Sequence, residues 1–206
     1  MEQTLERWRA ITDNRELVRF VAGMFSRLAI HVSDREERLT VVHDGDQVTL
    51  LPGADEKACD YLVTIDAHEA DRLADEASRP HLGEVERFRI MRAMFTPATA
   101  ATLRTPPMDS PVLKWLSGAE SIIHVRLLSP IRDEPDGTHT LIYASWQWLV
   151  IPGLHGKPKR LYTMTVEQSA DYQRRVHKLL THGTLAGWIR FGRWYRQWRR
   201  DVSVRV

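Results

Sequence analysis

The chain has 206 residues, 43% of them hydrophobic and 27% charged, which is ordinary for a globular protein that buries a core. No apolar run approaches the roughly 20 residues that a membrane-spanning helix needs, and the charged N-terminus is not that of a signal peptide. The single cysteine, Cys59, excludes an internal disulfide, so we expect a cytoplasmic location.

Charge is divided unevenly along the chain. Residues 1–110 hold 14 Lys and Arg against 20 Asp and Glu, a net of −6, whereas residues 111–206 hold 15 against 7, a net of +8. This asymmetry is typical of surfaces with different partners. It is equally consistent with two halves that neutralise each other by packing together.

The first half predicts helices followed by a small sheet. Apolar residues recur at steps of three and four from Leu17 to Leu28, after Asp13 and Glu16 spaced as a capping box. Asp44-Gly45 favours a tight hairpin between two of the strands that follow. Runs with strand character lie at 28–32, 39–43, 48–51 and 61–65.

A second helix is expected after Asp66, which stands where a helix N-cap belongs. Residues 88–91 then suggest another strand. Pro97 is typical of a first helical turn, which predicts a short helix ending at Leu103.

Residues 105–111 hold three prolines and form the best linker candidate, which divides the chain into domains 1–105 and 112–206. Beyond it we expect a long hairpin of residues 122–128 and 140–151, turned at Pro135-Asp136-Gly137. A strand at 161–166 and two helices follow, the first opened by a capping box of Thr165 and Gln168. No internal repeat is evident.

The last predicted helix, 184–200, combines aromatic and basic residues. Such a mixture suits a lipid headgroup layer, and it also suits single-stranded nucleic acid, which we consider the weaker reading. The plain alternative is that the rings pack on the domain while the arginines face water. For peripheral membrane contact the candidate docking residues are Trp188, Arg190, Arg193, Trp194 and Trp198.

No residue pattern indicates catalysis, a metal site or a cofactor. The nine histidines lack the paired spacing of zinc ligands, and neither a phosphate-binding glycine loop nor a nucleophile elbow is present. We therefore expect no catalytic residue, no metal and no cofactor, and we expect binding rather than an enzyme.

Residues 20–104 resemble the sterol-carrier-protein-2-like lipid-binding fold. The likeness rests on the strands that end in VTLLPG (48–53), on CDYLVTID (59–66) running into a helix, and on the Met- and Phe-bearing segment that follows. The resemblance implies an α+β fold with a small, mostly antiparallel sheet covered by helices. Here that fold is extended by the C-terminal β-hairpin and two helices, packed on the first module.

Members of that family hold sterols, acyl chains or similar lipids in an apolar tunnel between sheet and helices. The resemblance therefore implies non-catalytic binding and transfer of a sterol, isoprenoid or acyl lipid. There are two alternatives. One is a small isomerase, cyclase or hydratase that acts on a hydrophobic metabolite, and the other is a structural or regulatory protein with a filled core. The oligomeric state stays open. The residues expected to line the pocket are Phe20, Met24, Phe25, Leu28, Leu73, Met91, Met94, Phe95 and Leu103.

Overall fold

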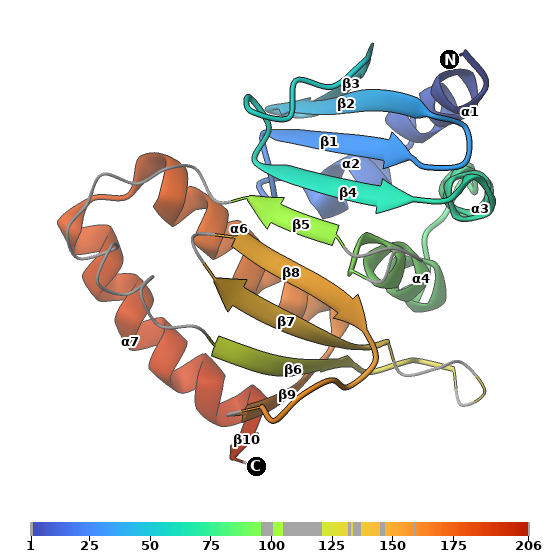
Figure 1. The fold of residues 1–206 in the computed structure, drawn as a ribbon. Helices are drawn as coiled ribbons and strands as arrows, with labels where there is room; N and C mark the ends of the chain where they lie inside the picture. The colour runs from blue at the N-terminus through green and yellow to red at the C-terminus, as the bar shows by residue number, and fades with distance from the viewer. Residues whose placement is uncertain are drawn as a thin grey trace.

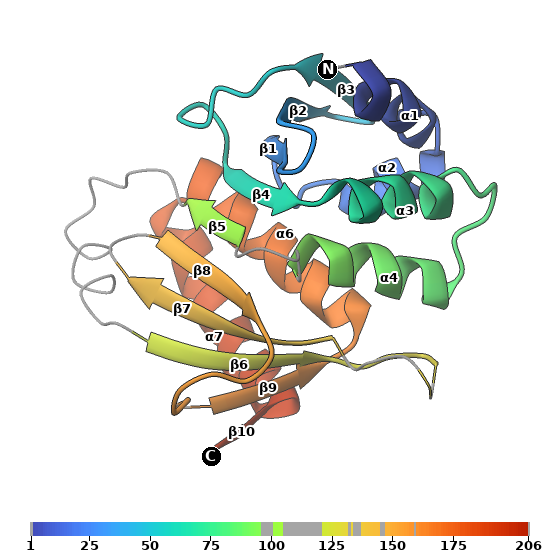
Figure 2. The same cartoon turned by 45° about the vertical axis from the view of Figure 1, so that its right-hand side comes forward.

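The computed structural model describes residues 2–95, 101–104, 121–131, 133, 137–144, 147–158 and 160–205. Within these residues, six helices and ten strands form an α+β fold. The strands make one mixed sheet, and the helices lie together on one of its faces (Figures 1 and 2).

The elements divide into two sets in chain order. The first set is α1 (Glu2–Thr12), α2 (Arg15–Val21), β1 (Arg27–Val32), β2 (Glu37–Asp44), β3 (Gln47–Pro52), β4 (Tyr61–Ile65), α3 (Ala67–Ala77), α4 (Glu84–Phe95) and β5 (Ala101–Arg104). The second set is β6 (Ser121–Leu127), β7 (Thr138–Ala144), β8 (Gln147–Pro152), β9 (Arg160–Met164), α6 (Val166–His182), α7 (Leu185–Val202) and β10 (Ser203–Arg205). We call these sets the N-terminal unit and the C-terminal unit.

The two units have the same strand connections. In the N-terminal unit, β1 pairs antiparallel with β2 and parallel with β4, β2 pairs with β3, and β4 pairs with β5. In the C-terminal unit, β6 pairs antiparallel with β7 and parallel with β9, β7 pairs with β8, and β9 pairs with β10. In each unit two helices lie between the last two strands. Among the described residues, the second unit thus repeats the part of the first from β1 to β5, while α1 and α2 have no described counterpart. The predicted hairpin, strand and two helices of the second half are present, and the repeat they form is what the sequence did not predict.

The strand registers repeat as well as the connections. Thr40 pairs with Leu51 in the first unit, and Thr140 pairs with Ile151 in the second. The strands β2 and β3 are therefore matched residue for residue by β7 and β8. The predicted single strand 140–151 is wrong, because these residues form two strands that pair with each other. Strand β5 pairs with β8 and joins the units into the order β10-β9-β6-β7-β8-β5-β4-β1-β2-β3.

Local signals account for several element ends. Gly45 has a φ of 59° in the two-residue hairpin between β2 and β3, a conformation that glycine adopts at little cost. The Asp66 side chain accepts from the Glu69 N–H at 2.7 Å and caps α3. Thr165 and Gln168 form the predicted capping box at the start of α6. These short-range predictions are confirmed.

Three other predictions in the first half are wrong. The N-cap of α2 is Asn14, whose side chain accepts from Leu17 N–H at 3.0 Å, not Asp13. Residues 88–91 are helical and lie within α4. Leu103 lies in a strand, β5, not at the end of a helix. The proposed linker, 105–111, falls outside the described residues.

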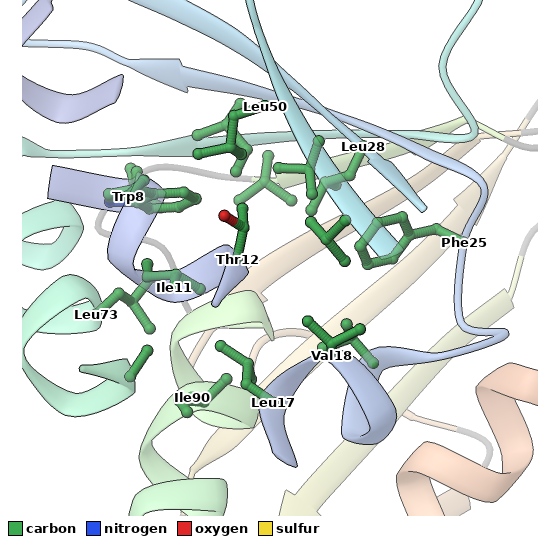
Figure 3. A pocket seen from close by; sticks show the side chains of 17 residues that line it. Trp8, Ile11, Thr12, Leu17, Val18, Phe25, Leu28, Leu50, Leu73 and Ile90 are labelled. Carbon is green, nitrogen blue, oxygen red and sulfur yellow. The ribbon is translucent and has the colours of Figure 1, made fainter. Parts of the chain in front are cut away.

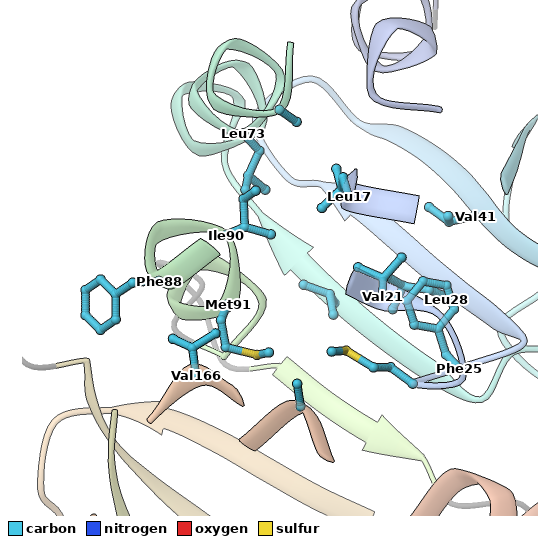
Figure 4. Packing of buried hydrophobic residues seen from close by; sticks show 14 of the residues in the cluster. Leu17, Val21, Phe25, Leu28, Val41, Leu73, Phe88, Ile90, Met91 and Val166 are labelled. Carbon is cyan, nitrogen blue, oxygen red and sulfur yellow. The ribbon is translucent and has the colours of Figure 1, made fainter. Parts of the chain in front are cut away.

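The misassigned helix α4 lies between the units, where it contacts both α3 and α6. Phe88, Ile90 and Met91 are all buried there, and Figure 4 shows Met91 beside Val166 at the start of α6. A helix buried on more than one side lacks a single apolar stripe, which is why its sequence resembles a buried strand. Among the described residues, no helix has the length and apolar character needed to cross a membrane.

Candidate functional site: an apolar cavity in the N-terminal unit

An apolar cavity of about 100 Å³ lies between the sheet of the N-terminal unit and the helices that cover it (Figure 3). Thr12 is the one polar residue of its lining, and its hydroxyl already donates to the Arg9 carbonyl at 2.7 Å. The lining residues are Trp8, Ile11, Thr12, Leu17, Val18, Val21, Phe25, Leu28, Ile30, Val41, Val48, Leu50, Val63, Ile65, Leu73, Ala77 and Ile90.

Helix α1 covers one side of the cavity and is held by polar contacts at its outer surface. Trp8 donates its indole N–H to the Ala70 carbonyl at 3.0 Å, so its ring lines the cavity with no unsatisfied donor. Arg7 and Arg35 both reach Asp71 on α3, at 3.0 and 2.7 Å. The hydrogen bond from Arg35 is the main cause that holds the pKa of Asp71 below its usual value.

Helix α2 covers a second side and is held by partners from both units. The Asn14 amide donates to the Ala77 carbonyl at 2.6 Å. Arg174, on α6 of the C-terminal unit, donates to the backbone carbonyls of Phe20 and Ala22. The helix contributes Leu17, Val18 and Val21 to the lining.

The cavity approaches the surface between α1 and the edge strand β3. Of the lining residues, Ile11 and Thr12 on α1 and Val48 and Leu50 on β3 are only partly buried, whereas most of the others are buried. The helix α1 and the strand β3 are in contact along this edge. A ligand that enters from solvent therefore has its shortest path here.

Three of the predicted pocket residues, Phe25, Leu28 and Leu73, line the cavity. Met24 and Met91 are fully buried in the surrounding core, so they support the cavity wall without facing the cavity. Phe20 packs partly buried against the same core. The side chains of Met94, Phe95 and Leu103 lie outside what the structure describes.

Most of the lining comes from residues that the sequence did not single out as ligand-binding. The strands contribute alternate residues, Val48 and Leu50 on β3 and Val63 and Ile65 on β4, because successive side chains of a strand point to opposite faces. That alternation is visible in the sequence and could have identified them. The contribution of Ile90 could not be found, because its segment reads as a strand.

The matching face of the C-terminal unit is filled by aromatic rings. By strand register, Tyr162 on β9 stands where Val63 stands on β4, and Tyr172 on α6 then corresponds to Leu73 on α3. Tyr172 stacks on Trp198 with ring centroids 4.7 Å apart. The rings that meet here, which we call the aromatic stack, are Tyr162, Tyr172, Phe191, Trp194, Tyr195 and Trp198. Burial raises the pKa of Tyr172 to about 12, so its phenol is neutral.

This stack removes one of the predicted docking residues from the surface and partly covers another. Trp198 is 8% exposed and Trp194 is partly buried, with Arg175 over its ring at 4.5 Å. The assignment of Trp198 as a docking residue is corrected, because its ring is buried in the stack, and that of Trp194 stays a prediction. Trp188 is partly buried, and Arg190 and Arg193 are exposed.

A serine and a histidine are in contact outside the cavity. The Ser26 hydroxyl is 3.1 Å from Nε2 of His177, and burial lowers the pKa of that histidine. The nearby Asp60 carboxylate accepts the backbone N–H groups of Ser26 and Arg27, at 2.6 and 2.9 Å. The contact of Ser26 with His177 joins α6 to the segment between α2 and β1 and so ties the two units together, while Asp60 fixes that segment within the N-terminal unit.

Among the described side chains, no cluster of three or more His, Cys, Asp and Glu could hold a metal ion. The site therefore consists of an apolar cavity closed by two short helices. Comparisons with protein-family models, with curated proteins and with solved structures found no match for this chain.

Proposed function

We propose that the protein binds one slender apolar ligand, an acyl or isoprenoid chain, in the cavity of the N-terminal unit and transfers it without covalent chemistry. The observation that carries this proposal is a cavity whose lining is apolar except for Thr12. The resemblance of residues 20–104 to sterol-carrier-protein-2-like domains supports the same class of ligand. Apolar lining with few polar groups gives affinity by burial and little discrimination among similar chains.

The size of the cavity favours a slender ligand over a rigid one. Its volume of about 100 Å³ lies below the roughly 150 Å³ of an engineered apolar cavity that takes up benzene. It is also about a third of the lower limit for pockets that hold drug-sized molecules, roughly 300 Å³. A chain can enter one methylene at a time as the walls part, whereas a fused ring system needs the whole width at once.

We expect the cavity to widen between α1 and β3 when a chain enters. The ion pairs of Arg7 with Asp71 and Asp75 lie on the outer surface of α1, where water can replace them at small cost. The cavity side of α1 is apolar, and its one hydrogen bond to α3 there, from the Trp8 indole N–H to the Ala70 carbonyl, limits how far the helix can move. We infer that α1 shifts outward when the ligand enters.

A chain-length series of fatty acids, with cholesterol for comparison, tests this function in vesicle-free buffer. Each buried methylene contributes about 0.8 kcal/mol, so affinity should rise up to about fourfold per added carbon until the widened cavity is full, and then level off. Cholesterol should bind more weakly than the best chain. Leu154→Ser, which changes an exposed apolar side chain on a loop of the other unit, is the control and should bind like the parent. Absence of saturable binding, or affinity that rises without a limit, would contradict the proposal.

A further inference from the structure

Helix α7 presents two different surfaces. Its inner surface packs on α6 and on the sheet, through the rings at 191, 194, 195 and 198. On the opposite side, at steps of three and four residues, every side chain is exposed. We call this opposite side the outer stripe, and it consists of Leu185, Ile189, Arg193, Arg196 and Arg200.

The first two turns of the outer stripe are aliphatic. Leu185 is 79% exposed and Ile189 is 52% exposed, whereas large apolar side chains normally lose most of their surface on folding. Trp188 lies beside them and is partly buried. The start of α7 lies at the left-hand edge of the molecule in Figure 1, well away from the cavity in the N-terminal unit.

Positive charge dominates the helix. Arginines stand at 190, 193, 196, 199 and 200, and the first acidic residue of α7 is Asp201, near the end of the helix. Arg193 and Arg196 follow directly after the aliphatic tip on the outer stripe. A short apolar tip beside a cluster of arginines matches the cross-section of an anionic bilayer surface, with acyl chains below and phosphates above.

We propose that the outer stripe of α7 docks on an anionic lipid bilayer. Leu185 and Ile189 enter the boundary between headgroups and acyl chains. Arg193 and Arg196 of the stripe meet the lipid phosphates, together with the exposed Arg190 beside it. The orientation of the rings argues against single-stranded nucleic acid, because the bases would stack on exposed aromatic side chains and here most of those rings pack inward. The aromatic stack anchors the helix, so the docking surface is preformed.

Flotation with vesicles tests the proposal on the full chain. The parent should bind phosphatidylcholine vesicles that contain phosphatidylglycerol, and binding should fall about tenfold or more without the anionic lipid or at high salt. The variants L185S/I189S and R193E/R196E should each bind at least about tenfold more weakly, since each basic residue near the surface is worth about fivefold.

Matched controls place the same changes elsewhere on the surface. Leu154→Ser removes an exposed apolar side chain and R9E/R15E reverses two exposed charges, and both should bind within about twofold of the parent. Urea unfolding confirms that each variant is folded, and fatty-acid binding in vesicle-free buffer tests the cavity separately. The proposal is overturned if the parent ignores anionic vesicles, if it binds neutral vesicles equally, or if the α7 variants bind like the parent. A dimer of the parent that the α7 variants abolish, without vesicle binding, would assign the surface to a second copy and overturn it too.

Discussion

Thr40 and Thr140 occupy the same place in the two units of this protein. The Thr40 hydroxyl donates to the carbonyl of Gly53 at 2.9 Å, and the Thr140 hydroxyl donates to the carbonyl of Gly153 at 2.7 Å. Both glycines follow the third strand of their unit and have positive φ angles, 77° and 84°. The same polar contact thus fixes the same turn twice, although the surrounding side chains differ.

We predict that Thr→Val substitutions at these two positions destabilise the protein unequally. Removing a hydroxyl leaves a partly buried carbonyl without its partner, which costs up to about 1 to 3 kcal/mol. Thr140 also accepts the His155 N–H at 2.9 Å, whereas the second partner of Thr40 is the weakly bonding Cys59 thiol. T140V therefore leaves two backbone groups without a partner and should cost more than T40V. Urea unfolding measures the difference. The control is T49V on the exposed side of β3, which should stay within about 0.5 kcal/mol of the parent. Equal losses for T40V and T140V would contradict the account.

The repeat leaves only a sparse trace in the sequence, in which Thr40, Gln47 and Pro52-Gly53 recur as Thr140, Gln147 and Pro152-Gly153. A strand register depends on the pattern of buried and exposed positions, not on the identity of each side chain. Val63 and Tyr162 stand at the same position, yet one lines a cavity and the other belongs to the aromatic stack. Side-chain differences of this size hide the likeness of two segments that fold alike.

The aromatic stack leads to a second prediction, on helix α7. Trp198→Ala should destabilise the protein by about 3 to 5 kcal/mol, because it empties a site where the ring stacks on Tyr172 and Tyr162. Ile189→Ala, on the same helix but 52% exposed, should change the unfolding free energy by less than about 0.5 kcal/mol. Thermal or urea unfolding of the two variants gives the comparison. A small effect at Trp198 would show that the stack does not fill the second unit.

The sequence predicted well those helix caps and turns that depend on residues close together in the chain. The Thr165 and Gln168 capping box and the Asp66 cap depend on side chains three residues from the groups they bind. The hairpin at Gly45 depends on a single backbone conformation. In contrast, the assignment of α4 and of β5 depends on distant parts of the chain, α6 and β8, which no local pattern contains.

The sequence led us to expect an apolar pocket, but it identified only some of the residues that line the cavity. Phe25, Leu28 and Leu73 face the cavity, but Met24 and Met91 pack beside it, because the direction of a side chain depends on how helix and sheet meet. Flexible methionines fill gaps in a core as readily as they line a pocket. Their presence alone does not distinguish the two roles.

A third prediction concerns His177, whose pKa is lowered by burial, an effect that His182 and His43 reinforce and Asp60 opposes. The folded protein then binds this proton less readily than the unfolded chain. The stability that His177 contributes is therefore present above the unfolded histidine pKa of about 6.5, and it is lost as the pH falls towards the folded pKa. The NMR titration midpoint of His177 should lie below about 6.5.

His177→Gln provides the control for this titration, because glutamine can still bond the Ser26 hydroxyl but carries no titrating group. Its unfolding free energy should fall less steeply than that of the parent between pH 7 and pH 5, where histidine titrates. Identical slopes for variant and parent would show that His177 is not perturbed by its place between the units.

A fourth prediction uses the cavity itself and two buried alanines of α3. Ala77 lines the cavity and Ala74 does not. Ala77→Leu should change stability by between about zero and a gain of 1 kcal/mol, because its added carbons enter empty space. Ala74→Leu should lose about 1 to 3 kcal/mol, because it overpacks a filled region. Urea unfolding separates the two, and equal losses would contradict the cavity.

The central claim is that an apolar chain occupies the space between α1, α2 and the sheet of the N-terminal unit. Its most direct test is NMR of the methyl-labelled protein with bound palmitate, observing nuclear Overhauser effects from the ligand chain to protein methyl groups. We predict effects to Leu28, Val63 and Leu73, all lost in Ala77→Leu. Effects only to exposed methyls such as those of Leu154 or Ile189, or none at all, would contradict the claim.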